Sequence, residues 1–285
     1  MIALDCFDKK LRIFDTLAKI YLNRSELGEY KELTATEIET KLKRLLESPI
    51  TDFSVVNKIY FRSKWGDLLH RIYKQASFTL LEIASGDEDM IPQAIAHSYP
   101  GSKYITVNMN ERLNERLLKK TEDLDIKLEL IKADANTLEE YILPNSVDII
   151  AFQHGVNDVL QAILCEQNGI DTTYSDWFEI LPRMIELVKE NIEENKLEKN
   201  TKSIFLKLIK SLLTYLTQDG IIAINHYMFQ YDLDLGYPHY LWENLIPIIR
   251  EWLKDMSGGK EIQIEEYSAQ CVVYPNMLNG RGTGG

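Results

Sequence analysis

Short apolar runs alternate with helical patterns through the middle of the chain, and this alternation constrains the fold more than any other feature. The runs are "SFTLLEIA", "KYITVNM", "KLELIKAD", "SVDIIAFQ" and "GIIAINHY". Each has the length of a strand, and most end at small or polar residues. Such alternation predicts β-α-β units and a mostly parallel sheet, and the continuous run "VDIIAF" is typical of a strand buried on both faces. We therefore expect an α/β fold.

The segments around these runs predict how the chain is divided. Residues 1–76 show helical patterns only, and we interpret them as an N-terminal helical cap ahead of an α/β domain over residues 77–285. The segment between the fourth and fifth runs is longer than one crossover helix needs, which predicts a helical insertion around residues 156–200. Residues 261–274 predict an antiparallel hairpin at the end of the sheet.

Composition and charge exclude several classes of protein. Hydrophobic residues make up 45% of the 285 residues, which supports a sizeable core. The net charge of -12 repels phosphate backbones, so we expect no nucleic-acid partner. The three cysteines form no C-x-x-C pair, so we expect neither a disulfide scaffold nor a metal site. No stretch approaches the ~20 apolar residues of a membrane span, and the start lacks a signal-peptide pattern, so we expect a cytoplasmic protein.

The stretch "LLEIASGDEDMIPQAIA", residues 80–96, has the form of a ligand-binding strand, loop and helix. A dinucleotide enzyme would carry G-x-G-x-x-G here to let the backbone approach a pyrophosphate, and a phosphate loop would add a lysine. This loop has one glycine, Gly86, followed by Asp87, Glu88 and Asp89. Because carboxylates repel a pyrophosphate, the loop disfavours NAD, FAD and ATP and favours a cationic ligand without phosphate.

The order of motifs from this loop onward resembles that of the class I, Rossmann-like S-adenosylmethionine-dependent methyltransferases. The family begins its sheet with [D/E]-x-G-x-G-x-G, and this chain has Glu82-Ile83-Ala84-Ser85-Gly86-Asp87-Glu88 in that place. Glu82 matches the acid and Gly86 the central glycine, whereas Ala84 and Glu88 replace glycines. S-adenosylmethionine carries a sulfonium and an α-ammonium but no phosphate, so carboxylates near it are physically sensible. The resemblance implies this cofactor and the family's sheet order, with a terminal antiparallel hairpin.

The resemblance also implies cofactor contacts at the carboxyl ends of the strands. The family's second strand ends in an acid that binds the ribose, and its third is followed by an acid or amide near the adenine. The implied cofactor-binding residues here are Glu82, Ala84, Ser85, Gly86, Asn108, Met109, Asp134, Ala135 and Gln153. Asn108 and Asp134 could equally be turn formers, and Ser85 with Glu88 also fits a helix capping box.

Two histidines at adjacent strand ends are the candidate catalytic residues. His154 ends the fourth strand and His226 the fifth, so both should open onto the same crevice. We predict that they orient or deprotonate the methyl acceptor. The alternative for each is a hydrogen-bonded structural histidine. Methyl transfer itself mainly requires an acceptor that is held close, aligned and dry.

Four further residues are candidates for binding the acceptor: Tyr60, Arg62, Trp177 and Tyr227. The alternative is that they are core or solvated residues. The fourth strand lacks the [D/N]-P-P-[Y/F] signature of many enzymes that methylate base amines or glutamine amides. This leaves O-, N- or C-methylation of a small molecule or peptide. Aminocarboxypropyl transfer from the same cofactor and a non-catalytic, methyltransferase-like subunit are the alternatives, and a homodimer is one option for the assembly.

Overall fold

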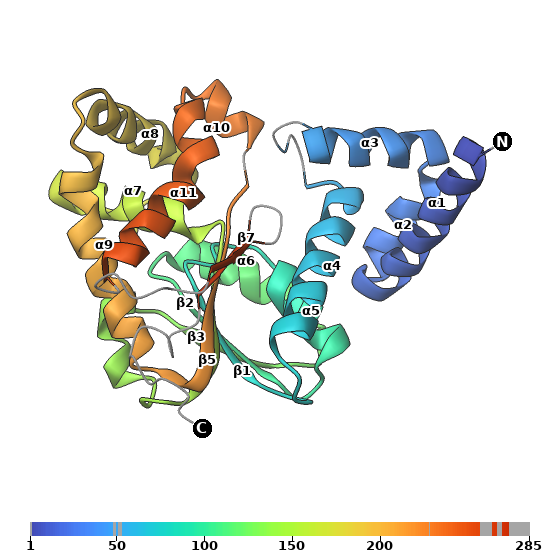
Figure 1. Ribbon diagram of the computed structural model, residues 1–285, viewed down its shortest axis with the longest axis horizontal. Helices are drawn as coiled ribbons and strands as arrows, with labels where there is room; N and C mark the ends of the chain where they lie inside the picture. The colour runs from blue at the N-terminus through green and yellow to red at the C-terminus, as the bar shows by residue number, and fades with distance from the viewer. Residues whose placement is uncertain are drawn as a thin grey trace.

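A central sheet with helices on both faces forms the body of the molecule (Figure 1). The computed structural model describes residues 2–47, 50, 53–227, 229–256, 264–266 and 270–273. Within this part of the chain the strands are β1 (Thr79–Ile83), β2 (Lys103–Val107), β3 (Lys127–Ile131), β4 (Val147–Gln153), β5 (Leu216–Asn225), β6 (Ile264–Glu266) and β7 (Gln270–Val273). Their order across the sheet is β3-β2-β1-β4-β5-β7-β6.

The direction of the strands confirms the predicted fold class. Strands β1 to β5 pair in parallel, whereas β7 runs antiparallel to both β5 and β6. This is the Rossmann-like methyltransferase sheet with its terminal antiparallel hairpin. The chain leaves β1 towards β2 and β3 on one side and returns to β4 and β5 on the other. A crevice at the carboxyl ends of the strands is expected where the strand order reverses, between β1 and β4.

The helices occupy the crossovers and the N-terminal region. They are α1 (Ile2–Tyr21), α2 (Arg24–Glu32), α3 (Ala35–Glu47), α4 (Val55–Ile72), α5 (Met90–Ser98), α6 (Glu111–Thr121), η1 (Ala135–Glu140), α7 (Gly155–Gln167), α8 (Trp177–Glu193), α9 (Leu197–Leu213), α10 (Gln230–Asp234) and α11 (His239–Met256). None of these helices has both the length and the apolar character needed to cross a lipid bilayer, as far as the described residues go.

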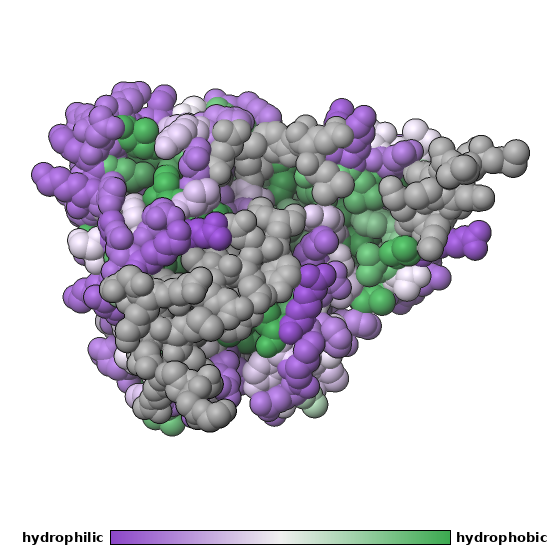
Figure 2. All heavy atoms as spheres, viewed as in Figure 1, coloured by the Kyte–Doolittle hydropathy of each residue, from purple (hydrophilic) through white to green (hydrophobic). Residues whose placement is uncertain are grey.

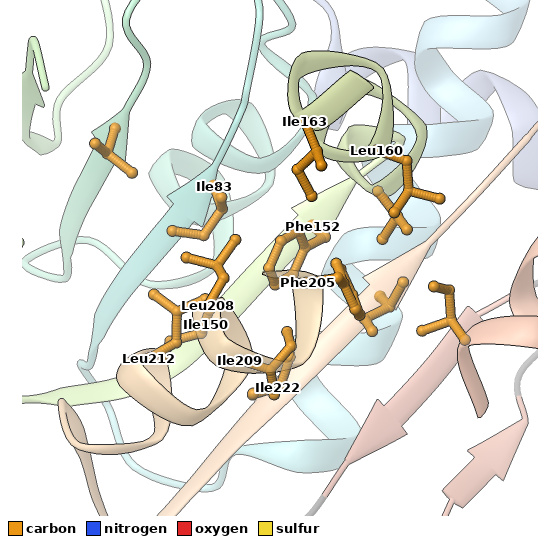
Figure 3. Packing of buried hydrophobic residues seen from close by; sticks show 14 of the residues in the cluster. Ile83, Ile150, Phe152, Leu160, Ile163, Phe205, Leu208, Ile209, Leu212 and Ile222 are labelled. Carbon is orange, nitrogen blue, oxygen red and sulfur yellow. The ribbon is translucent and has the colours of Figure 1, made fainter. Parts of the chain in front are cut away.

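Alternate residues of the buried strands point to opposite faces of the sheet, so an apolar cluster forms on each face. On one face, α9 places Phe205 and Ile209 against Phe152 of β4 and Ile222 of β5 (Figure 3). Full burial of such side chains contributes roughly 1.5–3 kcal/mol each. Among the residues that Figure 2 colours, hydrophilic ones predominate on this face, with patches of hydrophobic atoms between them.

Helix α4 joins the N-terminal helices to the other face of the sheet. Its Val56 and Ile59 belong to the apolar cluster formed with α1 to α3. Its Trp65 and Leu69 belong to the cluster that covers the sheet together with α5. Helix α4 therefore connects α1, α2 and α3 to the sheet, with Tyr21 of α1 adding to the second cluster, and these three helices lie to one side of the sheet in Figure 1.

The connection between β4 and β5 contains three helices, α7, α8 and α9. The sequence predicted a helical insertion around residues 156–200, and α7, α8 and the start of α9 cover this range. The start of α7 was not predicted, and this helix begins at Gly155, directly after the strand-end residue His154. An added Cβ at Gly155 would lie 2.8 Å from the carbonyl oxygen of Ile83, so the start of α7 packs closely against the end of β1.

Candidate active site

A cavity of about 740 Å³ opens at the carboxyl ends of β1 to β4. This volume falls within the ~300–1,000 Å³ that small-molecule sites usually have. Eleven of the residues predicted from the sequence line it, namely Ala84, Ser85, Gly86, Asn108, Met109, Asp134, Ala135, Gln153, His154, Trp177 and Tyr227. Four others, Glu82, His226, Tyr60 and Arg62, are not among its lining residues. The structure therefore brings most of the predicted site residues together at the predicted crevice.

The loop after β1 turns sharply through two residues with left-handed backbone conformations. Ala84 has a φ of 55° and Gly86 a φ of 60°. A Cβ added to Gly86 would meet no atom within 4 Å, so its backbone borders open space. Ala84 replaces a glycine of the family motif and keeps the turn at a cost of roughly 1–2 kcal/mol for an L-residue. The loop thus exposes backbone without a side chain to the cavity at Gly86, although it contains a single glycine.

Ser85 does not form the capping box that the sequence allowed. Its Oγ shares a hydrogen bond of 2.6 Å with Thr106 Oγ1, on the neighbouring strand β2. Helix α5 begins at Met90, and its N-cap residue is Asp89. Because the loop continues past Glu88 before the helix starts, the S-x-x-E spacing does not span a helix N-terminus. The hydroxyl of Ser85 instead ties the loop to the sheet.

The side chain of Glu82 lies on the face of the sheet that carries Tyr104 and does not line the cavity. Tyr104 donates a hydrogen bond of 2.7 Å to Glu82 Oε2, and the residue is 1% exposed. Glu82 Oε1 is buried with no hydrogen-bond partner in the described part of the chain. Burial, with a smaller contribution from the charge of Glu88, raises the pKa of Glu82 to about 8. Its carboxyl is therefore mainly protonated at neutral pH.

The three carboxylates after Gly86 lie in different environments. Asp87 pairs with Lys120 at 2.9 Å, and Asp89 pairs with Arg62 at 2.8 Å. Glu88 lines the cavity. The pKa of Glu88 is raised to about 7, mainly by burial, while the charge of Lys120 lowers it and the charges of Asp87 and Asp89 raise it. A cation near Glu88 would favour its charged form.

Two polar residues at the ends of β2 and β3 both line the cavity and form turns. Asn108 Oδ1 accepts a hydrogen bond of 3.0 Å from the backbone N–H of Asn110. Asp134 Oδ1 accepts one of 2.8 Å from the N–H of Asn136. The Nδ2 of Asn110 donates to the carbonyls of Thr172 and Ser175, which holds the loop between α7 and α8 above this end of the sheet.

The two candidate catalytic histidines stack on each other. The rings of His154 and His226 lie 5.0 Å apart and 3° from parallel, and Tyr227 stacks on His154 at 4.5 Å. Burial lowers the pKa of His154 to about 3 and lowers the pKa of His226 well below its ordinary value. Both rings are neutral at pH 7 and would be weak bases. An orienting role fits His154, which lines the cavity, better than His226.

Gln153, at the tip of β4, is held by the N-terminal helices. The indole N–H of Trp65 on α4 donates a hydrogen bond to Gln153 Oε1. Trp65 is fully buried and Gln153 is 2% exposed. Because Gln153 lines the cavity, this bond connects α4 directly to the site.

Arg62 and Tyr60 lie away from the cavity. Arg62 is fully buried and binds Glu26 on α2 at 2.7 and 3.1 Å and Asp89 at 3.0 and 2.8 Å. Tyr60 contacts Phe61 edge-on at 5.4 Å, and the amine of Lys64 lies 5.6 Å from its ring. The guanidinium of Arg62 is already paired with carboxylates, so it does not reach an acceptor in the cavity.

No protein-family model matches this chain, and no curated protein matches it. Solved structures resemble its fold at low identity. A candidate S-adenosyl-L-methionine-dependent methyltransferase from Methanococcus maripaludis is 12% identical with a TM-score of 0.45, over 75% of this chain and 83% of that one. A candidate rRNA methylase from Clostridium thermocellum is 12% identical with a TM-score of 0.43, over 74% and 94%.

A third solved structure was determined with a ligand. It is a methyltransferase from Thiobacillus denitrificans in complex with S-adenosyl-L-homocysteine, 13% identical with a TM-score of 0.32, over 58% of this chain and 47% of that one. Similarity at this level does not identify the reaction or the acceptor. The chemistry therefore has to follow from the side chains around the cavity.

Sequence reasoning missed several polar residues that line the cavity, among them Asn157, Asp158, Gln161 and Asp232. The first three lie within two turns of α7 after His154. Their spacing of three and four residues places them near one another on a helix. That spacing was a usable signal, but it required the start of α7 to be recognised. Asp232 belongs to α10, and only the folded chain brings it to this side of the cavity.

Proposed function

We propose that this protein is an S-adenosylmethionine-dependent methyltransferase that acts on a small molecule or peptide. The observation that carries the proposal is the cavity at the reversal of strand order, where Gly86 presents open backbone next to Glu88. An acidic border of this kind suits a sulfonium and an ammonium and opposes a diphosphate. S-adenosylmethionine, when bound, would supply an electrophilic methyl group.

Several residues of the chain would hold this cofactor. The loop from Ala84 to Glu88 would take its methionine end, Asn108 its ribose, and Met109 and Ala135 its adenine. His154 and Gln153, at the end of β4, would orient the acceptor and exclude water from the reacting atoms. Trp177 and Tyr227 would provide aromatic walls, since both line the cavity.

The proposal also gives a role to the N-terminal helices, a class of acceptor and a location for the protein. We expect the N-terminal helices to act as a cap, and the bond from Trp65 to Gln153 supports this role. The net charge of -12 favours a small-molecule or peptide acceptor over nucleic acid. We also retain the cytoplasm as the proposed location.

A pair of glycine variants tests the proposed cofactor site. Gly86→Trp would fill the space next to the loop, whereas Gly101→Trp places the same side chain at another glycine of positive φ with open space around it. We expect calorimetry to show that Gly86→Trp weakens S-adenosylhomocysteine binding more than 100-fold, which corresponds to about 2.7 kcal/mol. Gly101→Trp should bind like the unmodified protein. Retained binding by folded Gly86→Trp would overturn the placement of the site.

A further inference from the structure

A second group of polar side chains lines the cavity beyond the strand ends. Asn157, Asp158 and Gln161 come from the first two turns of α7, and Asp232 comes from α10. Asn157 is 4% exposed, Gln161 is 1% exposed and Asp232 is 8% exposed. Asn157, Asp158 and Gln161 follow Gln153 and His154 closely along the chain, and all five line the same cavity as Asp232.

Two buried amide oxygens in this group have no donor. The Nδ2 of Asn157 donates a hydrogen bond of 2.8 Å to Asp158 Oδ1, which fixes the orientation of the amide. Asn157 Oδ1 and Gln161 Oε1 are then buried without a hydrogen-bond partner among the residues that the structure describes. A buried acceptor without a donor costs roughly 1–3 kcal/mol. A ligand that brings N–H groups into the cavity would remove this cost.

Both carboxyl groups of this cluster line the cavity and are poorly solvated. Burial, with a smaller effect from the charge of Asp232, raises the pKa of Asp158 to about 8. Burial likewise raises the pKa of Asp232 to about 6. Burial, together with the charges of both acids, raises the pKa of the Tyr237 phenol. A cation between the acids would offset the burial of both carboxylates.

Acidic residues outnumber basic ones in the cavity. Among the residues that the structure describes, its lining contains seven acidic residues (Asp87, Glu88, Asp134, Asp158, Glu166, Asp171 and Asp232) and one lysine, Lys120. Lys120 is paired with Asp87 at the opposite loop. His154 is the lining histidine, and burial lowers its pKa to about 3, so it stays neutral. The cavity as a whole therefore attracts cations.

We infer that the methyl acceptor is an amine, whose nitrogen enters the cavity as an ammonium between Asp158 and Asp232. This inference rests on the proposed methyl transfer. A primary ammonium that bonds to both acids has one N–H left, which donates to Asn157 Oδ1 or Gln161 Oε1. Tyr227, Phe229 and Tyr231 line the same cavity and provide aromatic faces for a cation or an apolar substituent.

The reaction that follows is N-methylation. Asp158 of the cluster accepts the proton that the ammonium has to lose before its nitrogen can react. The ammonium transfers one proton to the carboxylate of Asp158, which leaves a lone pair on nitrogen. The lone pair forms the new N–C bond to the methyl group while the C–S bond breaks and its electron pair stays on sulfur as a thioether. Asp158 then releases the proton to solvent. In the empty cavity burial keeps the carboxyl group of Asp158 mainly protonated at neutral pH, and an ammonium beside it favours the carboxylate that accepts the proton.

Other acceptor classes satisfy the cluster less well. A carboxylate acceptor would be repelled by Asp158 and Asp232. A hydroxyl group donates one hydrogen bond, so it would leave most of the four acceptor groups without a donor. An ammonium donates three hydrogen bonds and carries the complementary charge.

Binding of matched ligand sets tests this inference. The probe is a panel of primary and secondary amines, each paired with the alcohol and the carboxylate of the same carbon skeleton. Thermal shift and calorimetry are run with and without saturating S-adenosylhomocysteine, and mass spectrometry scores methyl addition. We expect binding and methylation to concentrate in the amine series. Equal response of the alcohols or carboxylates, or no response from any amine, would overturn the inference.

Conservative variants separate this inference from the proposed function. We expect Asp158→Asn and Gln161→Leu each to weaken the best amine at least tenfold while the affinity for S-adenosylhomocysteine changes less than twofold. Asp232→Asn provides a second variant should Asp158→Asn not fold. Glu179→Gln removes an exposed charge from α8 outside the cavity and serves as the control. Unchanged amine binding in these variants would overturn the amine site. Failure of the unmodified protein to bind S-adenosylhomocysteine would instead overturn the proposed methyl transfer.

Discussion

The guanidinium of Arg62 donates hydrogen bonds to both carboxylate oxygens of Asp89, at 3.0 and 2.8 Å. The same guanidinium binds Glu26 of α2, whose carboxylate also accepts a hydrogen bond of 2.8 Å from Lys58. Asp89 directly precedes α5 and follows the loop that borders the cavity. This buried network therefore connects two N-terminal helices to the loop where the cofactor is proposed to bind.

Removing Arg62 should strongly destabilise the protein, because Glu26 and Asp89 would remain as buried charges. We expect Arg62→Met to lower the free energy of unfolding by about 3–5 kcal/mol in urea denaturation. The control is the triple variant Glu26→Gln, Arg62→Met, Asp89→Asn, which removes the charges together and should lose less stability. A triple variant as unstable as Arg62→Met would show that the ion pairs are not the cause.

Ala84→Gly should stabilise the protein, because glycine adopts a positive φ without steric cost. Ala84 has a φ of 55° in the loop after β1. The relief of about 1–2 kcal/mol is partly offset by the greater backbone entropy of glycine, so we expect a net gain of about 0.5–1 kcal/mol in the free energy of unfolding. Asn145→Gly, also at a φ of 55°, is the control and should gain less, because asparagine tolerates this conformation. A loss of stability in Ala84→Gly would contradict the strained turn.

Glu82 should make the protein less stable as the pH rises. Its pKa is raised from 4.5 to about 8, so its contribution to stability is fully present below the unfolded pKa and is lost as the pH rises through the folded pKa. We expect the free energy of unfolding of Glu82→Gln to fall less than that of the unmodified protein between about pH 5 and 8. Glu179→Gln, on the exposed side of α8, should follow the unmodified protein. Parallel pH curves for Glu82→Gln and the unmodified protein would show that Glu82 is not buried as a carboxylic acid.

Gly155 should tolerate no side chain, because its Cβ would lie 2.8 Å from the carbonyl oxygen of Ile83. We expect Gly155→Ala to lower the free energy of unfolding by about 1–3 kcal/mol and to weaken S-adenosylhomocysteine binding through displacement of His154. Gly28→Ala is the matched control. Its Cβ would meet no atom within 4 Å in helix α2, so the change should stabilise the helix by up to about 1 kcal/mol. Equal effects of the two alanines would contradict the close contact between α7 and β1.

The fold was predictable where a buried strand is a continuous apolar run, as "VDIIAF" is in β4. The start of helix α7 was not predicted, although Val156, Leu160 and Ile163 have helical spacing. Helices are usually recognised by a serine, threonine or aspartate cap, and α7 begins instead after His154 in a left-handed conformation. A helix that starts immediately at a strand end has no loop residues to signal it.

The candidate site was predictable where the chain order itself places residues at strand ends, as with Gly86, Asn108 and Gln153. The direction of the Glu82 side chain was not predictable from the chain order. Successive strand residues point to opposite faces of the sheet, and Glu82 shares its face with Tyr104. The partners of Arg62 lie 27 and 36 positions away in the sequence, so its burial depends on tertiary contacts. Asp158 and Asp232 line the same cavity for the same reason.

Calorimetric titration of the unmodified protein with S-adenosylhomocysteine, NAD and ATP tests the central claim most directly. We expect S-adenosylhomocysteine to bind at one site per chain with a micromolar Kd, about -8 kcal/mol, and NAD and ATP to release no heat of binding. Tight binding of NAD or ATP, or no binding of S-adenosylhomocysteine by the folded protein at millimolar concentration, would contradict a cofactor site for a cationic nucleoside beside Gly86 and Glu88.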